Sequence, residues 1–145
     1  MPPAPRVVLD TNVCLDLFVF GDPRCAGLHE ALREGRLEAV TRDDCRAEWH
    51  AVLGYPQLVL DEARRGQARS AYDACVRRLP ALPAAPRLPR CADPDDQMFL
   101  ELAAAAGVQA ILSRDDALLK LARRTRRDGL FEILPPWAWR DLLRA

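Results

Sequence analysis

Short apolar runs alternate with amphipathic stretches along most of the chain. Runs of the length expected for buried strands occupy residues 6–10, 37–41, 108–112 and 130–134. Between and after them, apolar residues recur at intervals of three and four, with capping residues or proline at several starts and glycine near several ends. This pattern predicts helices over residues 11–18, 23–34, 43–53, 61–76, 94–106, 116–123 and 136–143.

Strands that alternate with helices predict an α/β protein whose central parallel sheet is covered by helices on both faces. A chain of 145 residues has room for one such domain, which we expect to span about residues 6–143. In sheets of this kind, ligands bind beyond the carboxyl ends of the strands. We therefore expect the functional residues directly after the strands.

A proline-rich segment separates the two halves of the pattern. Proline recurs there every third residue, at Pro80, Pro83, Pro86 and Pro89. The spacing matches a polyproline II turn. We interpret the segment as a stiff connector within one domain, and the alternative is a ligand for an aromatic-lined groove.

The charge balance excludes one class of nucleic-acid binder. Lysine plus arginine and aspartate plus glutamate both number 21, so the chain lacks the basic excess of a non-specific DNA coat. A nuclease is compatible with this balance, because its acidic centre offsets its substrate-binding arginines. The candidate phosphate contacts are Arg64, Arg65 and Arg69 on one predicted helix, together with the basic residues of 123–127. The alternative for either cluster is a solvated helix face.

Five scattered cysteines form neither a zinc knuckle nor a redox motif, because no Cys-x-x-Cys pair occurs. The sequence shows no signal peptide and no apolar run long enough to span a membrane. We therefore expect a cytoplasmic protein with reduced thiols and no membrane partner.

Two acids follow predicted strands where a ligand site is expected. Asp10 ends the first strand, and Asp115 comes shortly after the strand that ends at Leu112. Each has a structural alternative. The helix that follows the first strand can be capped by Thr11 or Asn12, and Asp10 could help to cap it. Residues 113–116 also match a capping box with Asp116 in the return position.

Glu48 is the third candidate acid. The predicted helix 43–53 has an apolar stripe of Cys45, Trp49, Val52 and Leu53, and Glu48 lies along its edge. A carboxylate in that position needs a partner or a metal, because burying it unpaired is costly. The alternative is an ion pair with an arginine.

A fourth acid begins the helix predicted over residues 94–106. Asp93 is a candidate N-cap, and Pro94 occupies the first helical position. Capping fully explains the aspartate at position 93. Capping accounts only in part for the two acids that follow. Asp96 precedes Phe99 and Ala103 at helical spacing, so we expect its side chain to lie on the inward face of this helix.

Four carboxylates that converge on one sheet edge repel one another unless cations neutralise them. Hard oxygen ligands favour Mg²⁺ or Mn²⁺ over zinc. Such an ion can activate a water and stabilise in-line attack on a phosphodiester. No serine–histidine–acid set competes, because His29 and His50 are isolated. The candidate ligands are therefore Asp10, Glu48, Asp96 and Asp115.

Four motifs in register resemble those of PIN domains. Residues 8–13 (VLDTNV) resemble the family's opening motif, and residues 93–103 (DPDDQMFLELA) resemble its central acidic helix start. Residues 111–115 (ILSRD) are similar to its strand followed by Thr/Ser-x-Asp, and Glu48 with the residues after it matches the second-acid helix. The resemblance covers residues 6–143 and is nearest to the bacterial, VapC-like toxin components of toxin–antitoxin pairs.

The resemblance implies a Rossmann-like three-layer α/β/α fold and Mg²⁺- or Mn²⁺-dependent endoribonuclease activity on single-stranded RNA. It also implies a homodimer and an antitoxin partner. The family's metal ligands match Asp10, Glu48, Asp96 and Asp115, with Asn12 and Ser113 in support and Asp93 and Asp116 as less certain additions. Cys14 and the very basic residues 123–127 depart from the family pattern without removing a ligand.

Two other classes of protein remain as alternatives. A haloacid-dehalogenase-like phosphatase also has an aspartate after its first strand, but it needs a second aspartate two residues on, where this chain has Asn12. A PIN-like interaction protein with a degenerate site is the non-enzymatic alternative, and intact acids at all four positions count against it.

Overall fold

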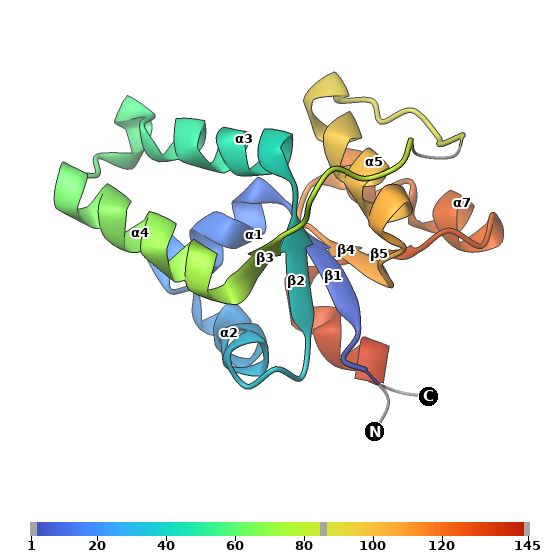
Figure 1. Cartoon of the computed structure of the whole chain (residues 1–145), viewed down its shortest axis with the longest axis horizontal. Helices are drawn as coiled ribbons and strands as arrows, with labels where there is room; N and C mark the ends of the chain where they lie inside the picture. Colours follow the sequence, from blue (N-terminus) through green and yellow to red (C-terminus); the bar gives the residue numbers. More distant parts are fainter. Residues whose placement is uncertain (1–2, 85–86, 144–145) are drawn as a thin grey trace.

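A five-stranded parallel sheet forms the centre of the molecule. The computed structural model describes residues 3–84 and 87–143. The strands are β1 (Arg6–Leu9), β2 (Glu38–Thr41), β3 (Val76–Arg78), β4 (Ala110–Leu112) and β5 (Glu132–Leu134). They lie in the order β3-β2-β1-β4-β5, and each neighbouring pair is parallel (Figure 1).

The strand order reverses direction between β1 and β4. From β1 the chain moves outward through β2 to β3, then crosses back to place β4 on the other side of β1. Such a reversal opens a crevice beyond the carboxyl ends of the two central strands. Asp10 directly follows β1, and Asp115 follows β4 by three residues.

Helices cover both faces of the sheet, which gives three layers. One layer contains α1 (Thr11–Leu15), η1 (Asp16–Phe20), α2 (Ala26–Arg33), α3 (Asp43–Leu53), α4 (Glu62–Cys75) and η5 (Pro136–Leu143). The other contains η4 (Pro94–Asp96), α5 (Gln97–Ala106), α6 (Asp116–Leu119) and α7 (Ala122–Arg127). Figure 1 shows α3 and α4 on one side of the sheet and α5 and α7 on the other. The short turns η2 (Pro23–Cys25) and η3 (Pro56–Leu58) precede α2 and α4.

The alternation of side chains along β1 explains why two cores form. Val7 and Leu9 point into the core beneath α1 to α4, and Val8 points into the core beneath α5. Both faces of a parallel sheet are buried, so β1 is apolar from Val7 to Leu9, between the charged residues Arg6 and Asp10. On the first side, Trp49 of α3 stacks on Tyr72 of α4 with ring centroids 5.5 Å apart.

The structure corrects several of the predicted elements. The helix predicted over 61–76 ends at Cys75, and the chain continues as β3, a strand that the pattern did not reveal. Only Val76 of its three residues is buried, whereas Arg77 and Arg78 are exposed, so an edge strand leaves no apolar run to detect. The helix predicted over 116–123 is divided into α6 and α7.

The first helix also differs from its prediction. Asp10 is the N-cap in place of Thr11 or Asn12, and its side chain accepts a hydrogen bond from the Thr11 N–H. The helix continues past Phe18 as a π-helical turn to Phe20. Residues 136–143 form a 3₁₀ helix.

The proline-rich connector runs between β3 and η4 without regular secondary structure in its described part. Pro80, Pro83 and Pro89 belong to this part, and Pro86 lies outside the described residues. Buried Leu79 and Cys91 anchor its two ends in the core beneath α5. Within residues 3–84 and 87–143, no helix is long and apolar enough to cross a membrane.

Candidate metal centre

Three carboxylates meet at the crevice between β1 and β4. Asp10 comes from the end of β1, Asp96 from the end of η4 and Asp115 from the start of α6. One carboxylate oxygen of each lies within 4.8 Å of the others. The parallel sheet thus brings together acids that are up to 105 residues apart in the sequence.

Asp10 is held by three hydrogen bonds. Its Oδ1 accepts from the Thr11 N–H at 2.7 Å, and its Oδ2 accepts from the Ser113 hydroxyl at 2.6 Å. Its own N–H donates to the carbonyl of Leu112 at 3.0 Å, which continues the pairing of β1 with β4. With only 4% of its surface exposed, Asp10 has one fixed orientation.

Ser113 links Asp10 to Asp115. The Asp115 N–H donates to the Ser113 hydroxyl oxygen at 2.9 Å, while that hydroxyl donates to Asp10. The Oδ1 of Asp115 accepts from the Ala117 N–H at 2.9 Å, so Asp115 is the N-cap of α6. The alternative of a capping box over residues 113–116 is therefore wrong, because it required Ser113 to cap the helix.

Asp96 differs from its neighbours in lacking hydrogen-bond donors. It is 8% exposed, and its buried Oδ2 has no hydrogen-bond partner in the described part of the chain. A buried carboxylate oxygen without a donor is costly. An unpartnered carboxylate oxygen beside two other carboxylates is suited to binding a cation.

Burial and mutual repulsion shift the acidities of the three groups. Desolvation by burial raises the pKa of Asp10 to about 6, against the hydrogen bonds from Ser113 and Thr11. Burial, followed by the interaction with Asp115, raises the pKa of Asp96 to about 8. The hydrogen bond from Asp96 and then that from Ala117 lower the pKa of Asp115. The opposite shifts of Asp96 and Asp115 are those expected of two neighbouring acids that repel each other when both are ionised, a repulsion that a bound cation would relieve.

Glu48 lies beside the cluster without belonging to the group of three. Its Oε2 accepts a hydrogen bond from the Thr11 hydroxyl at 2.6 Å, so it is joined to the residue that follows Asp10. Glu48 is half-buried on α3, and its charge contributes to the raised pKa of Asp10. No arginine among the described residues forms an ion pair with it, in contrast to the alternative considered from the sequence. Its role as a ligand stays a prediction.

Asn12 contacts a partly buried ion pair that the sequence pattern did not reveal. Asp16, only 4% exposed, accepts from Arg114 at 2.7 Å from Nε and at 3.1 Å from the second guanidinium nitrogen. The Asn12 Oδ1 accepts from the Arg114 N–H at 3.4 Å. Asp16 follows buried Val13 by three residues, so helical spacing alone could have placed it on the inward face. The identity of its partner was not readable, because 98 residues separate the two.

The less certain candidates lie outside the group of three. Asp93 is exposed and accepts from the Asp95 N–H at 3.0 Å, which makes it the N-cap of η4. Asp116 is exposed at the start of α6. The structure therefore gives Asp93 a capping role and brings neither acid to the cluster.

The arginines proposed as phosphate contacts have mixed surroundings. Arg65 and Arg69 both pair with Glu62 on α4, at 3.5 and 2.9 Å, whereas Arg64 is exposed. On α7, Arg126 pairs with Glu132 and Arg127 with Asp128. Substrate binding by either cluster stays a prediction.

The fold and the site together define a class of protein: a parallel α/β sheet with a carboxylate cluster, suited to a divalent cation, at the point where its strand order reverses. A sequence model of the PIN domain matches residues 6–117, which is most of the chain, and the protein belongs to the PIN-domain family. No curated protein matches the chain closely enough to serve as a relative. PIN domains are generally metal-dependent nucleases, and this match leaves the phosphatase alternative without support.

Proposed function

We propose that this PIN domain is an Mg²⁺- or Mn²⁺-dependent endoribonuclease that hydrolyses phosphodiester bonds of single-stranded RNA. The observation that carries the proposal is the convergence of Asp10, Asp96 and Asp115 within 4.8 Å at the crevice of the sheet. Metal-dependent nuclease chemistry needs such a site, because the phosphodiester and the attacking water both require positive charge nearby.

The residues present fit a hard divalent cation. All three groups offer carboxylate oxygen, the donor type that Mg²⁺ and Mn²⁺ prefer. The buried Oδ2 of Asp96 has no donor to satisfy it within the described residues, so a cation would supply its missing partner. Asp10, Asp96 and Asp115 would hold the ion, and Glu48 would reach it directly or through a water.

The surrounding residues keep the ligands in position. When bound, the cation supplies charge to activate a water and to stabilise the phosphodiester under attack. The Ser113 hydroxyl donates a hydrogen bond to Asp10 and accepts one from the Asp115 N–H. One hydroxyl therefore fixes the distance between two ligands. Thr11 links Asp10 and Glu48, since its N–H donates to Asp10 and its hydroxyl donates to Glu48. Metal ligands oriented in this way lose less freedom when the ion binds.

The choice of RNA, and of a toxin role, rests on the motifs of the sequence. The Asp-Pro-x-Asp segment that begins η4 resembles the bacterial toxin branch of the family, so we propose that the protein acts with a cognate antitoxin and as a homodimer. A reducing compartment such as the cytoplasm suits the five cysteines, which are free thiols and mostly buried. A small DNA-binding protein encoded beside this chain would support the toxin role.

Cleavage of a labelled single-stranded RNA in Mg²⁺, in Mn²⁺ and in EDTA tests the proposal. We expect cleavage with either metal, none in EDTA, and none by the variant Asp96→Asn, which removes the charge of the unpartnered ligand. Asp93→Asn is the matched control, since it removes an acid from the same turn and asparagine caps a helix as well as aspartate does.

Full activity in Asp93→Asn with loss in Asp96→Asn is the expected result. Cleavage in EDTA, or an active Asp96→Asn variant, contradicts the proposed metal centre. If the wild-type protein binds the metal but does not cleave RNA, the result favours the alternative of a PIN-like interaction protein.

A further inference from the structure

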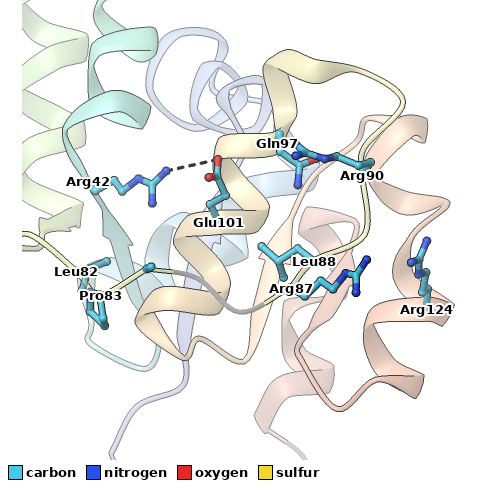
Figure 2. A pocket seen from close by; sticks show the side chains of 10 residues that line it. Arg42, Leu82, Pro83, Arg87, Leu88, Arg90, Gln97, Glu101 and Arg124 are labelled. Atoms are coloured by element: carbon cyan, nitrogen blue, oxygen red, sulfur yellow. Dashed lines mark ion pairs between the residues drawn. The ribbon is translucent and has the colours of Figure 1, made fainter.

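A groove lined by arginines lies between the connector and the helices α5 and α7. It encloses about 850 Å³. Its walls come from the start of α3, from the described residues 82–84 and 87–90 of the connector, and from α5 and α7. Figure 2 shows the charged and polar side chains that line it, which are Arg42, Arg87, Arg90, Gln97, Glu101 and Arg124.

Three of the four arginines in the groove are free of carboxylates. Arg87, Arg90 and Arg124 are exposed, and none of them forms an ion pair within the described residues. The fourth, Arg42, is bound to Asp44 at 2.7 Å and lies 3.9 Å from Glu101. In Figure 2, Arg87 extends from the connector toward Arg124 on α7.

Arginines without an acidic partner are a minority among the described residues. Most arginines of the described residues pair with an acid, including Arg65 and Arg69 on α4 and Arg126 and Arg127 on α7. Three of the seven that form no ion pair line this one groove. Guanidinium groups without a carboxylate keep their donors available for a phosphate.

The wall formed by the connector is attached to α5. The Gln97 side chain donates from Nε2 to the carbonyl of Pro89 at 3.1 Å and accepts from the Cys91 N–H at 2.8 Å. Arg90 lies between these two anchored residues, and Pro89 and Cys91 are buried. The backbone that carries Arg90 is therefore fixed against α5.

The groove lies near the acidic cluster along the chain, because Gln97 lines the groove and is the neighbour of Asp96. Gln97 follows Asp96 directly, so their Cα atoms are about 3.8 Å apart. Six residues separate Arg90 from Asp96, which limits the distance between their Cα atoms to about 20 Å even in a fully extended chain. A polymer with phosphates at regular spacing can therefore contact the arginines and the cluster at once.

We propose that the groove binds the sugar–phosphate backbone of a single-stranded nucleic acid and leads it to the acidic cluster. This inference rests on the proposed nuclease function and names its substrate-binding surface.

Salt-dependent binding tests the role of the free arginines. The groove variant combines Arg87→Gln, Arg90→Gln and Arg124→Gln. Binding of a fluorescein-labelled single-stranded RNA oligonucleotide of mixed sequence is followed by anisotropy at several salt concentrations, in EDTA to prevent cleavage. Each lost phosphate contact lowers the log–log salt slope by about 0.7, so we expect a fall of about 2 for the variant.

A control variant removes the same number of positive charges elsewhere. Arg6, Arg33 and Arg36 lie near the amino ends of β1 and β2, at the opposite edge of the sheet from the acids. Their combined replacement by glutamine should leave the slope unchanged. A third variant, with Arg64, Arg65 and Arg69 replaced by glutamine, measures the α4 cluster by the same assay.

The outcomes separate the groove from the nuclease function. A groove variant with the wild-type slope, in a protein that cleaves RNA, overturns the groove and leaves the function standing. A wild-type protein that neither binds nor cleaves RNA overturns the proposed function itself. Loss of polyglutamate binding by the variant, with RNA binding unchanged, also overturns the proposal and indicates an acidic protein partner.

A DNA strand of the same sequence tests which chemical group the groove contacts. Phosphates are common to both nucleic acids, so we expect the groove variant to lower the salt slope for single-stranded DNA as much as for RNA. A fall confined to RNA overturns recognition through the backbone phosphates and points to the 2′-hydroxyl groups.

Discussion

Asp10 and Asp16 lie six residues apart and are equally buried, yet they have opposite electrostatic surroundings. Each is 4% exposed. Asp16 faces the guanidinium group of Arg114, which donates two hydrogen bonds to it. Asp10 faces a hydroxyl, a backbone N–H and two further carboxylates, and burial raises its pKa to about 6.

The difference shows how the same residue type can be structural at one position and available for chemistry at another. The charge of Asp16 is neutralised by the protein itself, so its carboxylate oxygens are occupied. The charge of Asp10 is neutralised by nothing within the described residues. A buried acid that the protein leaves without a cation is the one that can accept a cation from solution.

The largest expected effect comes from Asp10→Asn. Asparagine keeps the shape and can still accept from the Thr11 N–H, but it removes the charge that the cation requires. We expect RNA cleavage to fall more than about a hundredfold, since metal catalysis contributes several kcal/mol. Thermal unfolding should show an intact fold, because a poorly solvated charge has been removed. Single-turnover cleavage with excess Mg²⁺ measures the rate, and wild-type cleavage would exclude Asp10 as a ligand.

Arg114→Gln should produce the opposite result at Asp16. It leaves the buried Asp16 carboxylate without its cation, and we expect a loss of about 2 kcal/mol in the free energy of unfolding. This lies below the range for fully buried pairs, because Arg114 is partly exposed. Chemical denaturation measures it, with Arg24→Gln, which breaks the exposed pair with Asp22, as the control with little expected change. Equal losses in both variants would mean that burial does not distinguish Asp16.

Metal binding should stabilise the protein only when the acids of the cluster are intact. A cation at about 100 times its dissociation constant adds about 2.7 kcal/mol to the free energy of unfolding. For a chain of this size that raises the melting temperature by about 5–10 °C. Melts with Mn²⁺ and with EDTA should therefore differ for the wild type and coincide for Asp96→Asn. Coincident wild-type melts, with no heat of binding in calorimetry, would contradict the metal centre.

A further expected effect is the pH dependence of the stability of the metal-free protein. The raised pKa values of Asp10, about 6, and Asp96, about 8, mean that the folded state binds more protons than the unfolded state above about pH 4. Their contribution to stability is therefore present at low pH and is lost as the pH rises through about 6 to 8. The lowered pKa of Asp115 acts in the opposite sense and reduces the slope.

Denaturation in EDTA between pH 5 and 9 measures this slope, and Asp96→Asn should flatten it. Saturating Mn²⁺ should also remove the loss at high pH, because the ion binds the ionised acids. A metal-free protein that gains stability steadily over the same range would show that the acids of the cluster do not repel one another as inferred.

Local patterns were enough to place the elements that carry Asp10 and Glu48. Three apolar residues before Asp10 predicted β1, and the stripe of Cys45, Trp49 and Leu53 predicted α3 with the bounds that the structure has. The same reasoning failed at β3, because an edge strand with two exposed arginines has no apolar run. It also failed at the start of α6, where the N-cap is Asp115.

The sequence by itself determined the alternation of helices and strands, with the exception of β3, and hence the parallel sheet and the edge at which its acids gather. Periods of two and of three to four residues are local properties, which a single sequence displays. Only the tertiary structure decided which charges are neutralised: Asp16 meets an arginine 98 residues away, Asp96 keeps an unpartnered oxygen, and three arginines line one groove without an acid. Charge pairing and burial depend on distances in space, and residues that are remote in the chain set those distances only after folding.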